Sequence, residues 1–73
     1  MQFEDDNKEI VKITNKNIKE LKIVMLKKYG QTSYKKLSEE LGVSRTSIYN
    51  AINNEGSLDK LRAKIIKWIE DNR

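Results

Sequence analysis

The stretch that most constrains the fold of this chain is residues 34–53, which has the pattern of two short helices joined by a tight turn. Leu37 and Leu41 are four residues apart and therefore share one face of the first helix. Gly42 follows at the place where helices commonly end in a left-handed residue, a conformation that glycine adopts without steric cost. Ser44 is a favourable N-cap for the second helix. The sequence therefore predicts a helical corner here.

The second helix of this stretch, expected over residues 45–53, has two different faces. Ile48, Ala51 and Ile52 recur with helical spacing and form a narrow apolar stripe. The opposite stripe consists of side chains that can all donate a hydrogen bond: Arg45, Thr46, Tyr49, Asn50 and Asn53. A helix selected only for solubility would more often carry Lys and Glu, since Thr, Tyr and Asn are mediocre helix formers. The stripe therefore favours a helix that reads the major groove of DNA over a hairpin whose polar face merely meets water.

At these residues the chain resembles the helix-turn-helix of the phage Cro and CI repressor superfamily. The resemblance rests on Leu37, the small residue Ser38, the Leu-Gly-Val run that ends at Val43, the polar run after it and Ile48. It is specific over residues 34–53 and looser from Ile18 onward. The resemblance implies that the family's DNA-contacting positions are occupied by Ser44, Arg45, Thr46, Tyr49 and Asn50. It also implies that Tyr34 stands where a residue at a helix start commonly touches a phosphate.

The chain departs from the pattern of that family in two places. The loop after the second helix of the motif, Asn54 to Ser57, is shorter than the usual one. The last helix is expected to run uninterrupted to the C-terminus, where the family usually has two short helices. The resemblance therefore does not by itself imply the dimer geometry of the family for this chain.

Apolar spacing predicts one helix on each side of this pair. The first is expected to start at Asn17, with Glu20 as a capping-box partner, and to end at Gly30. Apolar side chains on several sides of this helix predict a central place in the core. These side chains are Ile18, Leu21, Ile23, Val24, Met25 and Leu26. Ser33 is the expected cap of the next helix, and Ser57 that of the last one.

The expected fold is all-α, a small four-helix domain with a helix-turn-helix, similar to that of lambda repressor. The domain is expected to span residues 14–73, after a partly ordered N-terminal arm of residues 1–13. No strand signals or turn dipeptides follow residue 53, which argues against a winged variant.

The last helix carries more apolar side chains than a chain of 73 residues readily buries: Leu58, Leu61, Ile65, Trp68 and Ile69 on one stripe, with Ile66 beside it. Large exposed apolar patches usually mark interfaces, so Trp68 and Ile69 are the candidates for a homodimer seam. The alternative is that both side chains belong to the core of the monomer.

Composition excludes several classes of function. The chain has no Cys and no His, which removes disulfides, the usual zinc sites and His-based catalysis. The acidic cluster Glu4–Asp6 has too few neighbouring ligands for a metal site. No glycine-rich phosphate loop, nucleophile with a base partner, membrane-length apolar run or signal peptide appears, so we expect a cytoplasmic protein without enzyme activity, cofactor or membrane contact.

The sequence thus predicts a sequence-specific DNA-binding transcriptional regulator, a repressor of phage or plasmid type that binds double-stranded DNA as a homodimer. Its net charge of +4 is compatible with attraction to phosphate. Arg45 and Asn50 are the expected base readers, since Arg pairs best with guanine and Asn with adenine. Glu39 and Glu40 are expected to face solvent, away from the phosphates.

Two alternatives stay open at this point. The same fold could be a protein-binding module such as an antirepressor or antitoxin, or an architectural factor that bends DNA. A regulatory protein partner would also suit a chain that carries no sensor domain.

Overall fold

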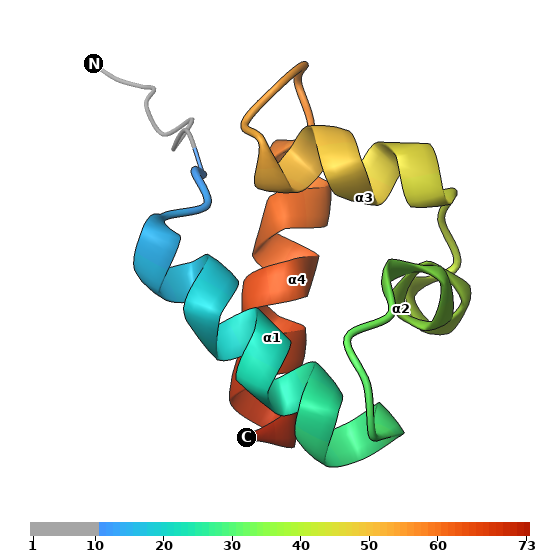
Figure 1. Ribbon diagram of the computed structural model, residues 1–73. Helices are drawn as coiled ribbons and strands as arrows, with labels where there is room; N and C mark the ends of the chain where they lie inside the picture. Colours follow the sequence, from blue (N-terminus) through green and yellow to red (C-terminus); the bar gives the residue numbers. More distant parts are fainter. Residues whose placement is uncertain (1–10) are drawn as a thin grey trace.

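The computed structural model describes residues 11–73, which form four helices and no strand: α1 (Asn15–Tyr29), α2 (Tyr34–Leu41), α3 (Arg45–Ile52) and α4 (Asp59–Asn72). Figure 1 shows α4 in the middle, with α1 packed along it and α3 lying across its N-terminal end. α2 packs against α3 and is seen end-on in this view, so α2 and α3 are not parallel. The prediction of a small all-α domain of four helices is confirmed.

One hydrophobic core joins the four helices. Its centre consists of side chains with no solvent exposure, and every helix contributes at least one: Met25, Leu37, Ile48, Ala51 and Ile65. Full burial of each larger side chain contributes about 1.5–3 kcal/mol. Helices α2 and α3 have 8 residues each and are too short to be stable alone. Packing around this core therefore holds them in place.

Helix α1 begins one turn earlier than predicted. Thr14 is its N-cap, because the Thr14 hydroxyl accepts the backbone N–H of Asn17 at 3.1 Å. The side chain of Asn17 accepts the Thr14 N–H in return at 3.0 Å, which completes a capping box. The predicted cap at Asn17 is therefore wrong, since Asn17 occupies the N3 position of the capping box and Glu20 is not part of the box. Gly30 ends the helix in a left-handed conformation, as predicted.

The expected central position of α1 is also wrong. Leu21, Val24 and Met25 are buried, whereas Ile23 and Leu26 are 57% and 52% exposed. The central helix is α4, which packs against both α1 and α3. Helix α1 therefore buries one face only and turns apolar side chains to solvent.

Helix α4 runs without interruption from Asp59 to Asn72, as predicted. Its N-cap is Leu58, which makes no side-chain capping bond, so the prediction of Ser57 as the cap is wrong by one residue. The carboxylate of Asp59 lies in the first turn, where the positive end of the helix dipole favours it.

Trp68 and Ile69 are buried within the single chain, with exposed fractions of only 6% and 2%. The Trp68 ring stacks on that of Tyr29 at a centroid distance of 6.0 Å, and its indole N–H donates to Glu40 at 2.9 Å. The prediction of a dimer seam at Trp68 and Ile69 is therefore corrected. The core of this chain contains both side chains, whereas Ile23 and Leu26 of α1 lie outside it.

Residues 11–13, predicted as the end of a partly ordered arm, are packed onto the domain. Ile13 belongs to the core with an exposed fraction of 5%. Its N–H and C=O both bond to the side-chain amide of Asn54, at 2.8 and 2.9 Å. The packed domain therefore begins before the predicted boundary at residue 14. The rest of the predicted arm, residues 1–10 with Glu4–Asp6, lies outside the described residues.

The carboxylate of Glu40 connects α2 to α1 and α4. One oxygen lies 2.9 Å from the Lys28 ammonium and accepts the Trp68 indole N–H, and the other accepts the Tyr29 hydroxyl. These donors, the Lys28 hydrogen bond foremost, lower the pKa of Glu40 from 4.5 to about 2. Glu40 is exposed, as predicted, but its carboxylate is also engaged within the protein, which was not predicted.

We expect Glu40→Gln to lower the free energy of unfolding at neutral pH by about 1 kcal/mol, a small value because solvent screens a side chain that is 34% exposed. Since the pKa is lower in the folded than in the unfolded chain, this contribution is complete above pH 4.5 and is lost as the pH falls toward 2. Urea denaturation across this range measures it. Glu39→Gln is the matched control, because Glu39 is exposed and forms no ion pair within residues 11–73. A difference between wild type and Glu40→Gln that does not shrink on acidification would contradict the assignment.

Candidate nucleic-acid interface

The candidate surface is formed by α2, α3 and the three residues between them. Helix α2 ends at Gly42, which has the left-handed dihedral angles φ 73° and ψ 32°. The Gly42 N–H bonds to the Glu39 carbonyl at 3.3 Å, and the Val43 N–H bonds to the Ser38 carbonyl at 3.0 Å. These two bonds form a Schellman motif, which closes the helix and turns the chain sharply. The predicted role of Gly42 is confirmed.

Helix α3 is fixed by a cap at each end. At its start the Ser44 hydroxyl accepts the backbone N–H of Ser47 at 3.1 Å, which confirms the predicted cap. Beyond its end Asn54 adopts a left-handed conformation with φ 60°, and its N–H bonds to the Ala51 carbonyl at 3.1 Å. Asn tolerates this conformation better than most residues with a side chain. The outer face of α3 therefore has a defined orientation along its whole length.

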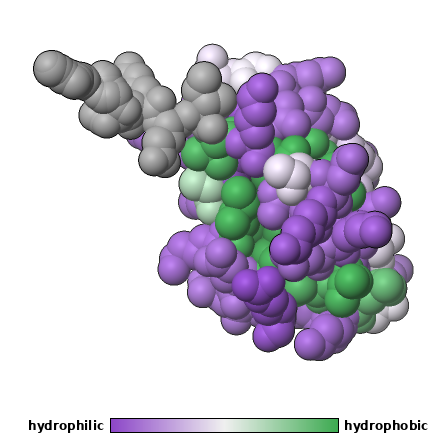
Figure 2. Space-filling model, turned by 90° about the vertical axis from the view of Figure 1, so that its left-hand side faces the viewer, coloured by the Kyte–Doolittle hydropathy of each residue, from purple (hydrophilic) through white to green (hydrophobic). Residues whose placement is uncertain are grey.

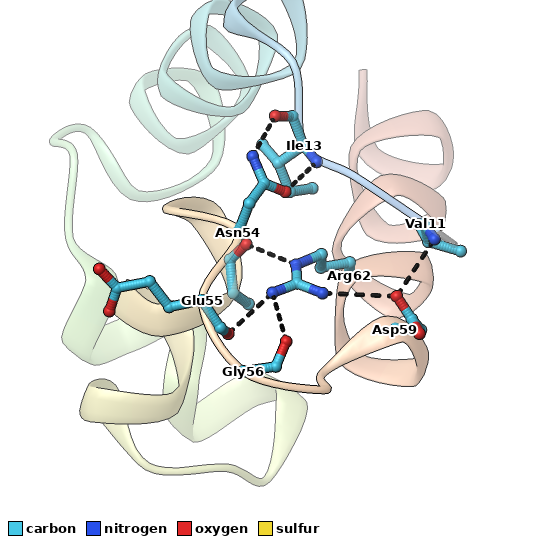
Figure 3. A network of polar contacts seen from close by, with 8 residues as sticks. Val11, Ile13, Asn54, Glu55, Gly56, Asp59 and Arg62 are labelled. Carbon is cyan, nitrogen blue, oxygen red and sulfur yellow. Dashed lines mark hydrogen bonds and ion pairs between the residues drawn. The ribbon is translucent and has the colours of Figure 1, made fainter. Parts of the chain in front are cut away.

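A buried arginine on α4 holds the loop that follows α3 (Figure 3). The Arg62 guanidinium is buried with an exposed side-chain fraction of 4%, and Asp59 lies 3.4 Å from its Nη1. It donates to three backbone carbonyls, those of Ala51 at 2.8 Å, Glu55 at 2.8 Å and Gly56 at 3.2 Å. The planar fork of Arg suits such multiple contacts, which a Lys ammonium would not reproduce. We call these contacts the Arg62 clamp.

Asp59, which lies beside Arg62, and Asn54, in the loop after α3, connect this region to residues 11–13 (Figure 3). Asp59 accepts the Val11 N–H at 3.1 Å, and the Asn54 amide pairs with both backbone groups of Ile13. These contacts were not predicted from the sequence. One signal was present, because Arg62 is a charged residue on the apolar face of α4, three positions before Ile65.

The structure places the predicted hydrogen-bonding stripe on the outer side of α3. Ile48, Ala51 and Ile52 are buried on the inner side. Arg45, Thr46, Tyr49 and Asn53 are exposed, and Asn50 is half-buried. Within residues 11–73 the side chains of these five residues make no hydrogen bond or ion pair. We call these five residues the α3 stripe, and its polar groups are available to a partner.

Tyr34, the first residue of α2, lies beside the α3 stripe. Its ring meets the ring of Tyr49 edge to face, with the centroids 5.1 Å apart. Burial, and to a smaller extent the neighbouring Tyr49, raises the pKa of Tyr34. Its hydroxyl therefore stays protonated at neutral pH and can donate a hydrogen bond. The contact between Tyr34 and Tyr49 extends the candidate surface from α3 to α2.

Ser44, another predicted contact residue, has a structural role as well. Its oxygen accepts the Ser47 N–H and lies 2.9 Å from the Ser47 hydroxyl. Because these contacts engage the side chain within the protein, Ser44 has less to offer a partner than the residues of the α3 stripe.

Helices α2 and α3 together carry three positive and two negative side chains. Arg45 is exposed and is the one charged residue of α3. Lys35 and Lys36 are exposed near the start of α2. Of the two acids in α2, Glu40 forms an ion pair with Lys28, whereas Glu39 forms no ion pair within residues 11–73. This balance suits an anionic partner.

Comparisons of the chain with protein-family models, with curated proteins and with solved structures found no match. The resemblance of residues 34–53 to Cro and CI repressors therefore stays a prediction. None of the four helices in the described part of the chain is long and apolar enough to cross a bilayer.

Proposed function

We propose that this protein is a sequence-specific DNA-binding regulator in which α2 and α3 act as a helix-turn-helix and α3 enters the major groove. The observation that carries this proposal is the α3 stripe, whose hydrogen-bonding side chains are not used within residues 11–73. An α-helix fits the major groove, where each base pair presents a distinct pattern of donors and acceptors. The caps of α3 and the Arg62 clamp hold the helix rigidly, as the reading of base edges requires.

Each residue of the surface has a proposed role. Arg45, in the first turn of α3, and Asn50, one turn later, are the principal base readers, directed at guanine and adenine respectively. Thr46 and Tyr49 contact base edges or phosphates. Tyr34 at the start of α2 and Asn53 after the end of α3 flank these residues, and phosphate contacts there would fix the register of the helix.

We further propose that two copies of the chain bind a two-fold symmetric operator. Helix α3 has 8 residues and can read only a few base pairs, too few for a specific site in a genome. Helix-turn-helix proteins solve this problem by placing two recognition helices in successive major grooves. A repressor of phage or plasmid type would work in this way. The buried residues Trp68 and Ile69 take no part in the pairing.

We expect Arg45→Ala to weaken specific DNA binding by about 1–3 kcal/mol and to relax the preference at one base pair. The stability of the domain should change by less than about 0.5 kcal/mol, since the exposed Arg45 side chain has no partner within residues 11–73. Fluorescence anisotropy on an operator duplex and on a scrambled duplex measures both affinities. Arg73→Ala is the control, because it removes one exposed positive charge at the end of α4. Equal loss on both duplexes would make Arg45 a phosphate contact and not a base reader.

The salt dependence of binding separates DNA binding from the protein-binding alternative. Phosphate contacts release counterions, so the logarithm of the affinity should fall linearly with the logarithm of the salt concentration. An antirepressor or antitoxin module would show no comparable affinity for DNA at any salt concentration. Absence of binding to random duplex at low ionic strength would therefore remove the proposed function.

A further inference from the structure

Helix α1 presents a second surface to solvent, opposite its contact with α4. Ile23 and Leu26 lie three residues apart on this outer face and are the most exposed large apolar side chains of residues 11–73, at 57% and 52%. Figure 2 looks onto the side of the molecule that carries α1 and shows apolar atoms at the surface among polar ones. The α1–α4 packing does not use these two side chains, so no contact described within the chain accounts for them.

Lysines surround this apolar pair. Four of them are exposed on α1, and none forms an ion pair within residues 11–73: Lys16, Lys19, Lys22 and Lys27. The one acid of α1, Glu20, lies 3.3 Å from Arg73 and is thereby neutralised. A face needed only for solubility would not place Ile23 and Leu26 between these lysines. The combination instead has the form of an apolar contact with a cationic rim.

This surface is separate from the α3 stripe. Helix α4 packs against α1 on one side and against α3 near its N-terminal end, so α4 stands between the two surfaces (Figure 1). An occupant of the outer face of α1 would therefore leave the α3 stripe accessible.

The geometry points to the outer face of α1 as a docking site for an acidic amphipathic helix of a second protein. Apolar side chains of that helix cover Ile23 and Leu26, and its Asp and Glu side chains pair with the flanking lysines. Charge complementarity selects this occupant. A second copy of this chain would bring two sets of lysines together, and DNA would leave the aliphatic side chains uncovered. Two apolar anchors make a small contact, so the complex is weak and transient.

An NMR titration of the whole chain tests the inference. The probe is a synthetic helical peptide with Leu at positions i, i+3 and i+7 and Glu on both flanks, and the matched probe carries Lys in place of Glu. We expect the Glu peptide to shift the amide signals of Lys19, Ile23 and Leu26, with an affinity that falls as salt is added. Binding of the Lys peptide with similar affinity, or shifts confined to α3, would overturn the inference.

Variants separate this face from general electrostatic attraction. The double variant Ile23→Ser, Leu26→Ser should bind the Glu peptide with an affinity lower by about tenfold or more. Circular dichroism should show an unchanged fold, because both side chains are exposed. The double variant Lys19→Glu, Lys22→Glu should also lower the affinity for the Glu peptide. Lys60→Glu with Lys64→Glu, on α4 beside Val43, makes the same change in net charge and should have little effect.

Three further results would overturn the inference. One is an equal loss of peptide affinity in the two charge-reversal variants. Another is sedimentation of the wild type as a dimer that Ile23→Ser with Leu26→Ser dissociates, which would assign the face to a second copy. The third is a loss of DNA affinity confined to the Lys19→Glu, Lys22→Glu variant. Because the inference does not depend on DNA binding by α3, failure of the peptide titration leaves the proposed function intact.

Discussion

Arg62→Ala is expected to lower the free energy of unfolding by about 3–5 kcal/mol, the loss typical of breaking a buried charged network. The guanidinium donates to the carbonyls of Ala51, Glu55 and Gly56, and its removal leaves one buried and two partly buried acceptors without their donor. A domain of 73 residues has a total stability of about 4–11 kcal/mol. The variant should therefore be close to unfolded at room temperature, or melt far below the wild type.

Urea denaturation followed by circular dichroism measures this effect. Arg62→Lys should lose a large part of the same stability, because an ammonium group keeps the charge but not the three-carbonyl geometry of the fork. Arg73→Ala is the matched control, since its side chain is 55% exposed and its ion pair with Glu20 is worth less than about 1 kcal/mol. If Arg62→Ala costs no more stability than Arg73→Ala, the clamp does not hold the loop.

Trp68→Ala is expected to lower the free energy of unfolding by about 3–5 kcal/mol, with loss of helicity. Trp68 is buried, stacks on Tyr29 and donates to Glu40, so its truncation leaves a cavity where α1, α2 and α4 meet. A dimer seam at Trp68 would instead give a variant that stays helical and loses self-association. Trp68→Phe keeps an aromatic ring and loses the indole N–H, and should cost less. A fully helical Trp68→Ala variant with an unchanged urea midpoint would contradict this role in the core and favour a dimer seam at Trp68.

Local signals made the helices predictable. The end of α2 at Gly42 and the caps at Ser33 and Ser44 depend on residues within one turn, and the structure confirms all three. The caps predicted at Asn17 and Ser57 are wrong because α1 begins after Thr14 and α4 begins after Leu58. Thr14 forms a capping box with Asn17, whereas Leu58 forms no side-chain cap, so a favourable cap residue does not by itself decide where a helix begins.

Contacts between distant parts of the chain were not predictable in the same way. Glu40 and Trp68 are 28 residues apart in sequence, and no periodic pattern relates them. Both α1 and α4 carry more apolar residues than one face holds, so the sequence could not decide which would remain exposed. The fold leaves Ile23 and Leu26 outside and buries Trp68 and Ile69. This choice depends on the position of α4 between α1 and α3.

The candidate site was the more predictable part, because the two faces of a short helix follow from its periodicity. Burial of Ile48, Ala51 and Ile52 places the α3 stripe on the outer side, as expected. The contact between Tyr34 and Tyr49 was not expected, since it requires the relative placement of α2 and α3. The Arg62 clamp that fixes the end of α3 was missed for the same reason.

Selection of bound sequences from random duplex DNA tests the central claim most directly. We predict enrichment of one motif with two-fold symmetry, whose half-sites are centred roughly 34 Å apart on the same side of the duplex. Each half-site should contain a guanine whose preference is lost when the selection is repeated with Arg45→Ala. Recovery of unenriched DNA by a folded wild-type protein at moderate salt, or the same motif from wild type and Arg45→Ala, would contradict it.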